Sequence, residues 1–225
     1  MSRPVLCRPE AYRCFVEQLP RLETTEGLLR AAVAVAMHER GHVEFAHVDA
    51  ILNALADRAR SAIRNWSCDS ALAHLHRVLF EEEKFTGNEE NYYLAANSYL
   101  PSVLQSRQGI PISLTLIYKA VAERVGLEVV GVNLPGHFVA QVSTTDGPLL
   151  IDSFFGGMML TLDEAWERAE QATGQRIRRG PLSVATHAQW LLRMIHNLQH
   201  VFTADGRRDH LMAMNELVSA LQEGK

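Results

Sequence analysis

Hydrophobic and polar residues recur at helical spacing through the first third of the chain. Residues 22–39 form a long segment rich in Ala, Leu and Val, and Gly41 follows as a stop signal. Residues 48–64 and 70–82 repeat apolar positions every three or four residues, with Arg, Asp and Glu between them. We therefore predict a helical N-terminal layer over residues 1–84 whose charged face lies in solvent.

The pattern changes after this layer. Between residues 85 and 108 the helical spacing fades, and Asn, Gly, Tyr and Pro residues indicate turns and ordered loops. Helical spacing returns over residues 113–125, in a largely apolar segment that Pro111 introduces and Gly126 ends. Because this helix has so little polar surface, we expect it to be buried.

Three short runs with strand character follow, at residues 128–134, 137–143 and 149–152. Turn residues separate the runs, and the second run alternates its side chains between two faces. A helix followed by an antiparallel meander is typical of an α+β fold. We predict a core over residues 85–180, in which the central helix packs on a small antiparallel sheet.

The tail returns to helical spacing from Thr186 onward, with a break at Asp205 and Gly206. This pattern predicts an αα-hairpin over residues 181–225. A single helical pair is shorter than the arrays of repeats that stand alone. We therefore expect the hairpin to pack on the core and to form one compact unit with the N-terminal layer.

Composition and charge narrow the classes of function. The formal net charge is −4, with acidic and basic residues mixed along the chain, so no basic patch indicates nucleic-acid binding. No apolar run approaches the ~20 residues that cross a bilayer, and the start, MSRPVLCRPE, has no hydrophobic signal segment. We expect a cytoplasmic protein that engages neither nucleic acid nor membrane.

The residues that most often bind metals give no reason to expect a metal or another cofactor. The three cysteines, Cys7, Cys14 and Cys68, form no CxxC pair, and we interpret them as small hydrophobic residues of helices. His196 and His200 have the i, i+4 spacing that places both rings on one helix face. They lack an HExxH motif or a cysteine partner, so a surface position explains them better.

Three residues of the core could act together chemically. Ser113 lies in the first turn of the central helix, where unpaired N–H groups and the macrodipole favour negative charge on a nucleophile or an oxyanion. His137 opens one strand and Asp152 closes the next, so both can lie at the same end of a meander. A nucleophile, a base and a carboxylate that orients the base form a catalytic triad. A helix cap, a structural histidine and a turn residue are the alternative interpretations.

Family resemblance favours the triad positions. The stretch RQGIPISLTLIYKAVAERVGL, then NLPGHFVAQV and LLIDSFFGG, resembles the transglutaminase-like core, and specifically its SirB-type branch. The resemblance runs from about residue 72 to residue 157. It implies a fold in which a Cys begins the central helix and a His and an Asp follow on the next strands. The matching positions in this chain are Ser113, His137 and Asp152. The tail, through RMIHNLQHVF, resembles the tetratricopeptide-like helices of longer members.

Ser113 departs from the family pattern, and this departure leaves two hypotheses. A hydroxyl ionises less easily than a thiol and must give its proton to the base during attack. The favoured hypothesis is a non-catalytic or weakly active protein with a binding or regulatory role. Its partner would be a peptide or protein at the cleft or at the C-terminal hairpin. The alternative is a Ser-His-Asp hydrolase or acyltransferase that acts on an amide or ester.

Four further residues are candidates for lining the same cleft and binding a ligand. They are Asn88, Asn97, Tyr99 and Gln108. Gln108 could donate a hydrogen bond to an oxyanion, as an upstream Gln does in papain-like sites. We nevertheless favour an exposed loop position for Gln108, and capping and turn roles explain Asn88, Asn97 and Tyr99 equally well.

Overall fold

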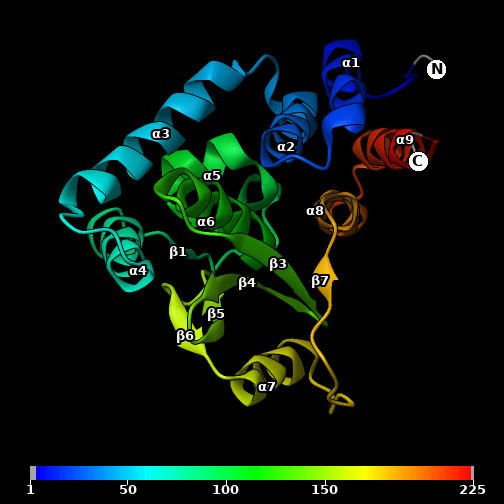
Figure 1. Ribbon diagram of the computed structural model, residues 1–225. Coiled ribbons are helices and arrows are strands. Elements are labelled where there is room, and N and C mark those ends of the chain that lie inside the picture. The colour runs from blue at the N-terminus through cyan, green and yellow to red at the C-terminus, as the bar shows by residue number, and fades with distance from the viewer. Residues whose placement is uncertain (1–3, 224–225) are drawn as a thin grey trace.

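The computed structural model describes residues 4–223, which form an α+β fold (Figure 1). The first residues of the predicted N-terminal layer and the last two of the predicted hairpin lie outside this range. Helices dominate the first half of the chain. They are α1 (Pro9–Gln18), the 3₁₀ helix η1 (Leu19–Arg21), α2 (Thr25–Arg40), α3 (Phe45–Ala62), α4 (Cys68–His76), the π-helix η2 (Arg77–Glu82), the 3₁₀ helix η3 (Ala95–Ser98) and α5 (Leu100–Ser106).

Local signals in the sequence explain where the longest of these helices begins and ends. The Thr24 hydroxyl accepts a hydrogen bond from the Gly27 N–H at 3.0 Å, which caps the start of α2. Gly41 ends α2 with a φ of +81°, a conformation that favours glycine. Helix α2 is buried along most of its length and contacts α1, α5 and α8, so it forms the centre of the helical layer.

The central helix of the core is α6 (Pro111–Val125), and it confirms the predicted buried helix. Pro111 occupies its first turn, where a missing N–H costs no hydrogen bond. Gly126 adopts the left-handed conformation that ends the helix, as predicted. Nearly all side chains of α6 are buried, between α3 on one side and the sheet on the other.

The sheet has five strands in the order β6-β5-β4-β3-β7, and all neighbouring pairs are antiparallel. Its strands are β3 (Val129–Leu134), β4 (His137–Thr144), β5 (Gly147–Asp152), β6 (Met158–Leu160) and β7 (Val184–Ala185). The first three confirm the predicted meander, whereas the two edge strands had not been predicted. A separate two-stranded parallel pair joins β1 (Thr86–Gly87) to β2 (Gln108–Gly109).

The two faces of the sheet pack against different helices. Phe138, Ala140 and Val142 of β4 belong to the large apolar cluster that includes α6. Val139 belongs to a second, smaller cluster with α7 (Leu162–Thr173), which covers the opposite face (Figure 1). The predicted alternation along β4 is therefore confirmed, and His137 lies on the α7 side by the same alternation.

Gly131 of β3 shows how closely the C-terminal helices approach the sheet. A Cβ atom at this position would lie 2.4 Å from the Trp190 ring and 2.6 Å from the Phe138 ring. Glycine is therefore required here, because it lets Trp190 pack against Phe138 with ring centroids 4.7 Å apart. This contact fixes α8 (His187–Ala204) against the core.

The C-terminal helices α8 and α9 (Arg208–Glu223) form the predicted αα-hairpin. Helix α9 also contacts α1. The Glu216 carboxylate accepts hydrogen bonds from the backbone N–H groups of Val5, Leu6 and Cys7, at 2.9 to 3.0 Å. The two ends of the described chain are therefore joined directly (Figure 1). Across residues 4–223, no helix has the length and apolar character needed to span a membrane.

Candidate functional site

His137 and Asp152 form a hydrogen-bonded pair at one end of the sheet. The Nε2 atom of His137 lies 2.8 Å from Oδ2 of Asp152. His137 begins β4 directly after the Pro135-Gly136 turn, and Asp152 is the last residue of β5. The antiparallel register brings these two strand ends together, as expected from the sequence.

The carboxylate of Asp152 is fully buried and bound on both oxygens. Oδ1 accepts hydrogen bonds from the backbone N–H groups of Phe154, at 3.1 Å, and Phe155, at 3.4 Å. Oδ2 faces His137, and the guanidinium Nε of Arg168 lies 3.9 Å from the same oxygen. These contacts fix the position of the carboxylate and the orientation of the His137 ring.

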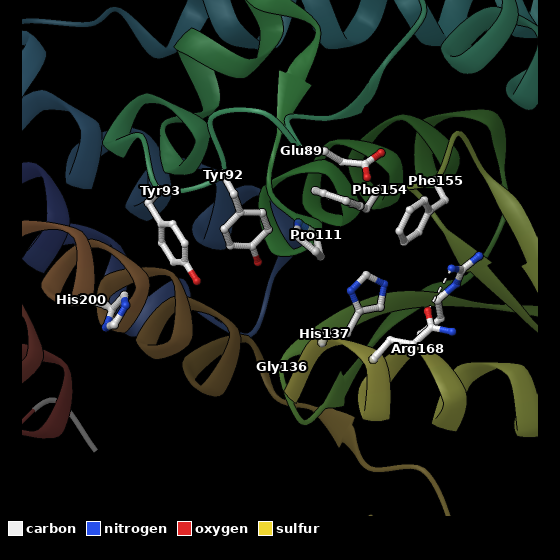
Figure 2. A pocket seen from close by; sticks show the side chains of 12 residues that line it. Glu89, Tyr92, Tyr93, Pro111, Gly136, His137, Phe154, Phe155, Arg168 and His200 are labelled. Atoms are coloured by element: carbon white, nitrogen blue, oxygen red, sulfur yellow. Dashed lines mark hydrogen bonds between the residues drawn. The ribbon is translucent and has the colours of Figure 1, made fainter. Parts of the chain in front are cut away.

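A cavity of about 560 Å³ lies against this pair (Figure 2). Its volume is in the range of small-molecule sites in proteins. Its lining residues are Glu89, Tyr92, Tyr93, Pro111, Gly136, His137, Phe154, Phe155, Arg168, Gln171, Ala172 and His200. They come from the segment after β1, from the start of α6, from the end of the sheet, and from α7 and α8, so the cavity forms only in the complete fold.

Aromatic rings form much of the cavity wall. Tyr92 packs edge-to-face against Tyr93 at 5.2 Å and against Phe154 at 5.9 Å between ring centroids. Phe154 contacts Phe155 at 5.1 Å, and the His137 ring lies 6.2 Å from each of them. The Phe154 ring packs directly against Gly87. A Cβ atom added at Gly87 would lie only 2.4 Å from this ring.

Ser113 does not belong to this cavity. It is completely buried in the third position of α6. Its Oγ lies 2.6 Å from the carbonyl oxygen of Asn97 and 3.0 Å from that of Ile110, and it accepts the Ile110 N–H at 3.2 Å. The hydroxyl has therefore used its donor and acceptor capacity on backbone groups.

The expected three-residue cluster is thus corrected to a pair. Within residues 4–223, the hydrogen-bond partners of the Ser113 hydroxyl are the backbone groups of Asn97 and Ile110, and His137 is not among them. The segment before α6 seals the hydroxyl, because Asn97 lies in η3, which packs over the first turn of the helix. Pro111, two residues earlier, is the residue of α6 that shares the cavity with His137.

Asn88 and Asn97 form a buried structural network instead of lining the cleft. The Asn88 side-chain amide donates to Oδ1 of Asn97 at 3.0 Å. The Asn97 amide in turn donates to the carbonyl oxygens of Asn91, at 2.7 Å, and Tyr92, at 3.0 Å. The expectation that these two residues bind a ligand is therefore not met by their positions, although they do shape the turn that presents Tyr92 and Tyr93 to the cavity.

Tyr99 and Gln108 also lie away from the cavity. The buried Tyr99 hydroxyl donates to Oε2 of Glu39 at 2.7 Å, so it joins the segment before α5 to α2. Gln108 is exposed in β2, and neither residue is part of the cavity wall. The interpretation of Gln108 as an exposed loop residue fits this position better than an oxyanion role.

The aromatic and arginine residues of the cavity were missed by sequence reasoning. Phe154 and Phe155 directly follow Asp152 in the LLIDSFFGG stretch, and this adjacency was an available signal. Arg168 gave no such signal, because α7 had not been predicted. Its start carries the sequence TLDE, in which Thr161 and Glu164 form a reciprocal capping box.

The ionisable groups differ in how far burial affects them. Burial raises the pKa of the Tyr92 phenol above its ordinary value, so this hydroxyl stays protonated in the cavity wall. Burial also lowers the pKa of Arg193, which lines a neighbouring hollow beside Gly136. Its guanidinium donates to the Leu134 carbonyl at 2.8 Å.

Cys14 and Cys68 lie in helices as predicted, whereas Cys7 lies in the bend before α1. Cys7 is buried, whereas Cys14 and Cys68 are half-buried, and all three are free thiols. Burial raises the pKa of Cys7 to about 12, so its thiol is unreactive. Within the part of the chain that the structure describes, no cluster of three or more His, Cys, Asp or Glu residues could hold a metal ion.

Comparison with known proteins identifies relatives of this chain. A UPF0162 protein of Xylella fastidiosa is 33% identical over 193 residues, covering 83% of this chain and 69% of the relative. A UPF0162 protein of Pseudomonas aeruginosa is 30% identical, covering 64% of this chain and 52% of the relative. F-box only protein 21 of Mus musculus is 35% identical over 140 residues, covering 59% of this chain and 22% of that protein.

No solved structure matches the chain significantly. A family model described as the transglutaminase-like superfamily matches residues 46–196 of this chain, from α3 to α8. This match includes the His137–Asp152 pair and every residue that lines the cavity except His200. By this match and the similarity to the Xylella protein, the chain belongs to the transglutaminase-like superfamily and to the UPF0162 proteins within it.

Proposed function

We propose that this protein is a non-catalytic member of the transglutaminase-like superfamily that binds a ligand in the cavity beside His137. The observation that carries the proposal is the makeup of the cavity wall. Among the described residues that line it, none carries a thiol or an aliphatic hydroxyl. The base and its orienting carboxylate are present, but no nucleophile of the type that acyl transfer uses shares the cavity with them.

Pro111 also supports this proposal, because it is the residue of α6 that lines the cavity together with His137. It lies in the first turn of α6 and faces the His137 ring across the cavity in Figure 2. A proline ring has no acidic proton to give to an imidazole. His137 can therefore accept a hydrogen bond or a proton from a ligand, but not from this part of the chain.

A rearrangement that brings Ser113 to His137 would break the buried hydrogen bonds that the hydroxyl makes with the Asn97 and Ile110 backbone groups. These backbone groups also bond one another and the Leu114 N–H, so they would keep a partner. The loss is the net contribution of the hydroxyl's own hydrogen bonding, on the order of 1 kcal/mol. The closed arrangement of Ser113 thus favours a binding role over a serine-dependent reaction.

A fluorophosphonate probe tests the proposal on the intact chain. We expect no covalent adduct on the wild-type protein by intact mass, at a probe concentration that fully labels a control serine hydrolase. A single adduct on the wild type that is absent from a folded Ser113→Ala variant would overturn the proposal. That result would make a Ser-His-Asp hydrolase or acyltransferase the better description.

A further inference from the structure

Arg168 and His137 meet at one carboxylate oxygen in the cavity wall. Oδ2 of Asp152 lies 2.8 Å from Nε2 of His137 and 3.9 Å from Nε of Arg168. The guanidinium and the imidazole are therefore neighbours, and both line the same cavity (Figure 2). The Arg168 guanidinium lies over the Phe155 ring, with its central carbon 4.1 Å from the ring centroid, and this contact restricts its position.

His137 has one ring nitrogen left for a ligand. Only 5% of the residue is exposed, and Nε2 is used by Asp152. The other nitrogen, Nδ1, has no hydrogen-bond partner among residues 4–223. This atom is not one of the buried polar atoms that lack a partner in the described chain, so it is accessible from the cavity, where a ligand atom can bind it. The cavity therefore contains a built polar site and is more than an apolar hollow.

The two charged groups beside the His137 ring carry opposite charges. Asp152 on β5 contributes one negative charge and Arg168 on α7 one positive charge. The other ionisable groups that line the cavity are Glu89 at its exposed rim, the phenols of Tyr92 and Tyr93, and His200 on α8. An anionic ligand at Nδ1 would be compensated if His137 took up a proton, since the imidazolium then lies between two carboxylates.

A second guanidinium, that of Arg193, adds positive potential close to His137. Arg193 donates to the carbonyl of Leu134, which is the register partner of His137 across the β3–β4 turn. Within the described chain no carboxylate lies within 4.0 Å of Arg193. Its hollow adjoins the main cavity, because Gly136 lines both. This uncompensated charge favours an anion over a cation at the imidazole.

The aromatic residues of the cavity wall indicate what the ligand carries besides its anionic group. Tyr92, Phe154 and Phe155 present aromatic surface to the cavity. Such surface binds an apolar or aromatic body, because it removes that body from water. A cavity of about 560 Å³ holds a body of this kind together with a small polar head group.

We infer that the cavity binds an organic carboxylate, with its carboxylate group between Arg168 and Nδ1 of His137 and its apolar body against the aromatic wall. This inference rests on the proposed binding function and names its ligand class. The carboxylate could belong to a small acid or to the C-terminal end of a peptide, since both present the same group. In either case binding takes up a proton onto His137.

Matched acids and amides test the inference. The probes are 3-phenylpropionate and N-acetyl-alanyl-phenylalanine, each compared with its neutral primary amide by calorimetry and by ¹H–¹⁵N chemical-shift titration. We expect the better acid to bind at least ~10-fold more tightly than its amide, because charge-assisted hydrogen bonds are the stronger ones. The acid that binds more tightly distinguishes a small ligand from a peptide end.

Proton uptake gives a second readout that apolar binding would not change. Calorimetry of the acid in phosphate and in Tris at the same pH should show proton uptake on binding, because a carboxylate at Nδ1 requires a proton on that nitrogen. The His137→Gln variant should bind without this uptake. The amides should show none in either protein.

Two arginine variants provide the matched control. Arg168→Gln removes a charge in the cavity wall and should weaken acid binding ~10-fold while leaving amide binding unchanged. Arg179→Gln removes the same charge from an exposed residue that pairs with Asp163 and Glu170 and lies outside the cavity. It should leave both affinities unchanged. Circular dichroism and thermal unfolding establish that each variant is folded.

The outcomes separate this inference from the proposed function. Equal binding of acid and amide, with shifts at the cavity residues, would overturn the carboxylate assignment and leave the binding function intact. Acid binding that Arg168→Gln does not weaken would also overturn it. If no probe shifts the signals of the cavity residues, the carboxylate assignment is overturned as well. The fluorophosphonate experiment decides independently whether the site is catalytic.

Discussion

The surroundings of Ser113 and those of His137 differ in how completely they are closed. Both residues are buried, and the resemblance of the sequence to the transglutaminase-like core predicts a reactive group at each position. The Ser113 hydroxyl is bound by the backbone at Asn97 and Ile110, whereas His137 keeps one nitrogen free beside an open cavity. The difference shows that burial alone does not distinguish a structural polar group from a functional one. What separates these two residues is that the free nitrogen of His137 is accessible from the cavity.

The largest expected effect comes from placing the same thiol in both regions. In Pro111→Cys the thiol shares the cavity with His137, which can take its proton and stabilise the thiolate. In Ser113→Cys the thiol stays sealed under η3. We expect Pro111→Cys to react with iodoacetamide at least ~100-fold faster than Ser113→Cys at neutral pH, with the modified residue identified by peptide mass mapping.

Two controls keep this comparison interpretable. The native Cys14 and Cys68 are half-buried, and mapping must report their labelling separately. Adding His137→Ala to Pro111→Cys should remove most of the rate advantage, because the base is lost. Equal rates at positions 111 and 113 would mean that the first turn of α6 opens in solution, and the contrast between the two regions would fail.

The next effect concerns the stability of the closed region. Asn97→Ala removes the side chain that binds Asn88 and the carbonyls of Asn91 and Tyr92. We expect a loss of about 2–3 kcal/mol in the free energy of unfolding, since several buried groups lose partners. Urea denaturation measures it. Asn215→Ala, at an exposed amide on α9, is the control and should change stability by less than ~0.5 kcal/mol.

Two buried histidines of the helical layer, His38 and His76, should make the free energy of unfolding depend on pH. Burial lowers the pKa of His76, which bonds the Tyr118 hydroxyl at 3.0 Å, and that of His38, each to about 4. Between about pH 6.5 and pH 4 the unfolded chain therefore binds more protons than the folded one, and stability falls as pH falls. We expect each residue to cost on the order of 1–2 kcal/mol at pH 5 relative to pH 7.

Denaturation at several pH values measures this dependence. His76→Gln retains a side-chain partner for Tyr118 but does not titrate, so its stability should fall less steeply below pH 6.5. His47→Gln, at an exposed position on α3, provides the control. An unchanged slope in His76→Gln would show that this ring is protonated within the folded protein.

The smallest expected effect is that of Ser113→Ala. The variant deletes one buried hydroxyl without adding volume, so a loss of about 1 kcal/mol in unfolding free energy is expected. Its affinity for 3-phenylpropionate should equal that of the wild type, because Ser113 lies outside the cavity. A change in that affinity would place Ser113 in contact with the ligand and contradict the separation of the two regions.

The sequence contained enough information for the order of the main elements. The boundaries of α2, α6 and the β3–β5 meander follow from periodicity, from glycine stops and from turn residues, which act over short distances. The pairing of His137 with Asp152 follows from the register of a meander. These features depend on neighbouring residues or on one simple topology, so they could be predicted.

The direction of the Ser113 side chain could not be predicted in this way. It depends on η3, a single turn within the segment expected to be irregular, and on backbone groups that any residue would carry. Helix α5 was missed in the same segment because its apolar positions span less than two turns. The contact of Arg168 with Phe155 required α7 to be placed on the sheet, which is a tertiary event.

The hydrogen bonds between the Glu216 carboxylate and the backbone of residues 5–7 have a consequence for synthesis of the chain on the ribosome. The groups it joins are 209 to 211 residues apart. At translation rates of roughly 5–20 residues per second, the start of the chain waits about 10–40 s before this partner emerges. During that interval α1 and α2 lack α8 and α9, so a nascent chain exposes apolar surface until its last helix is made.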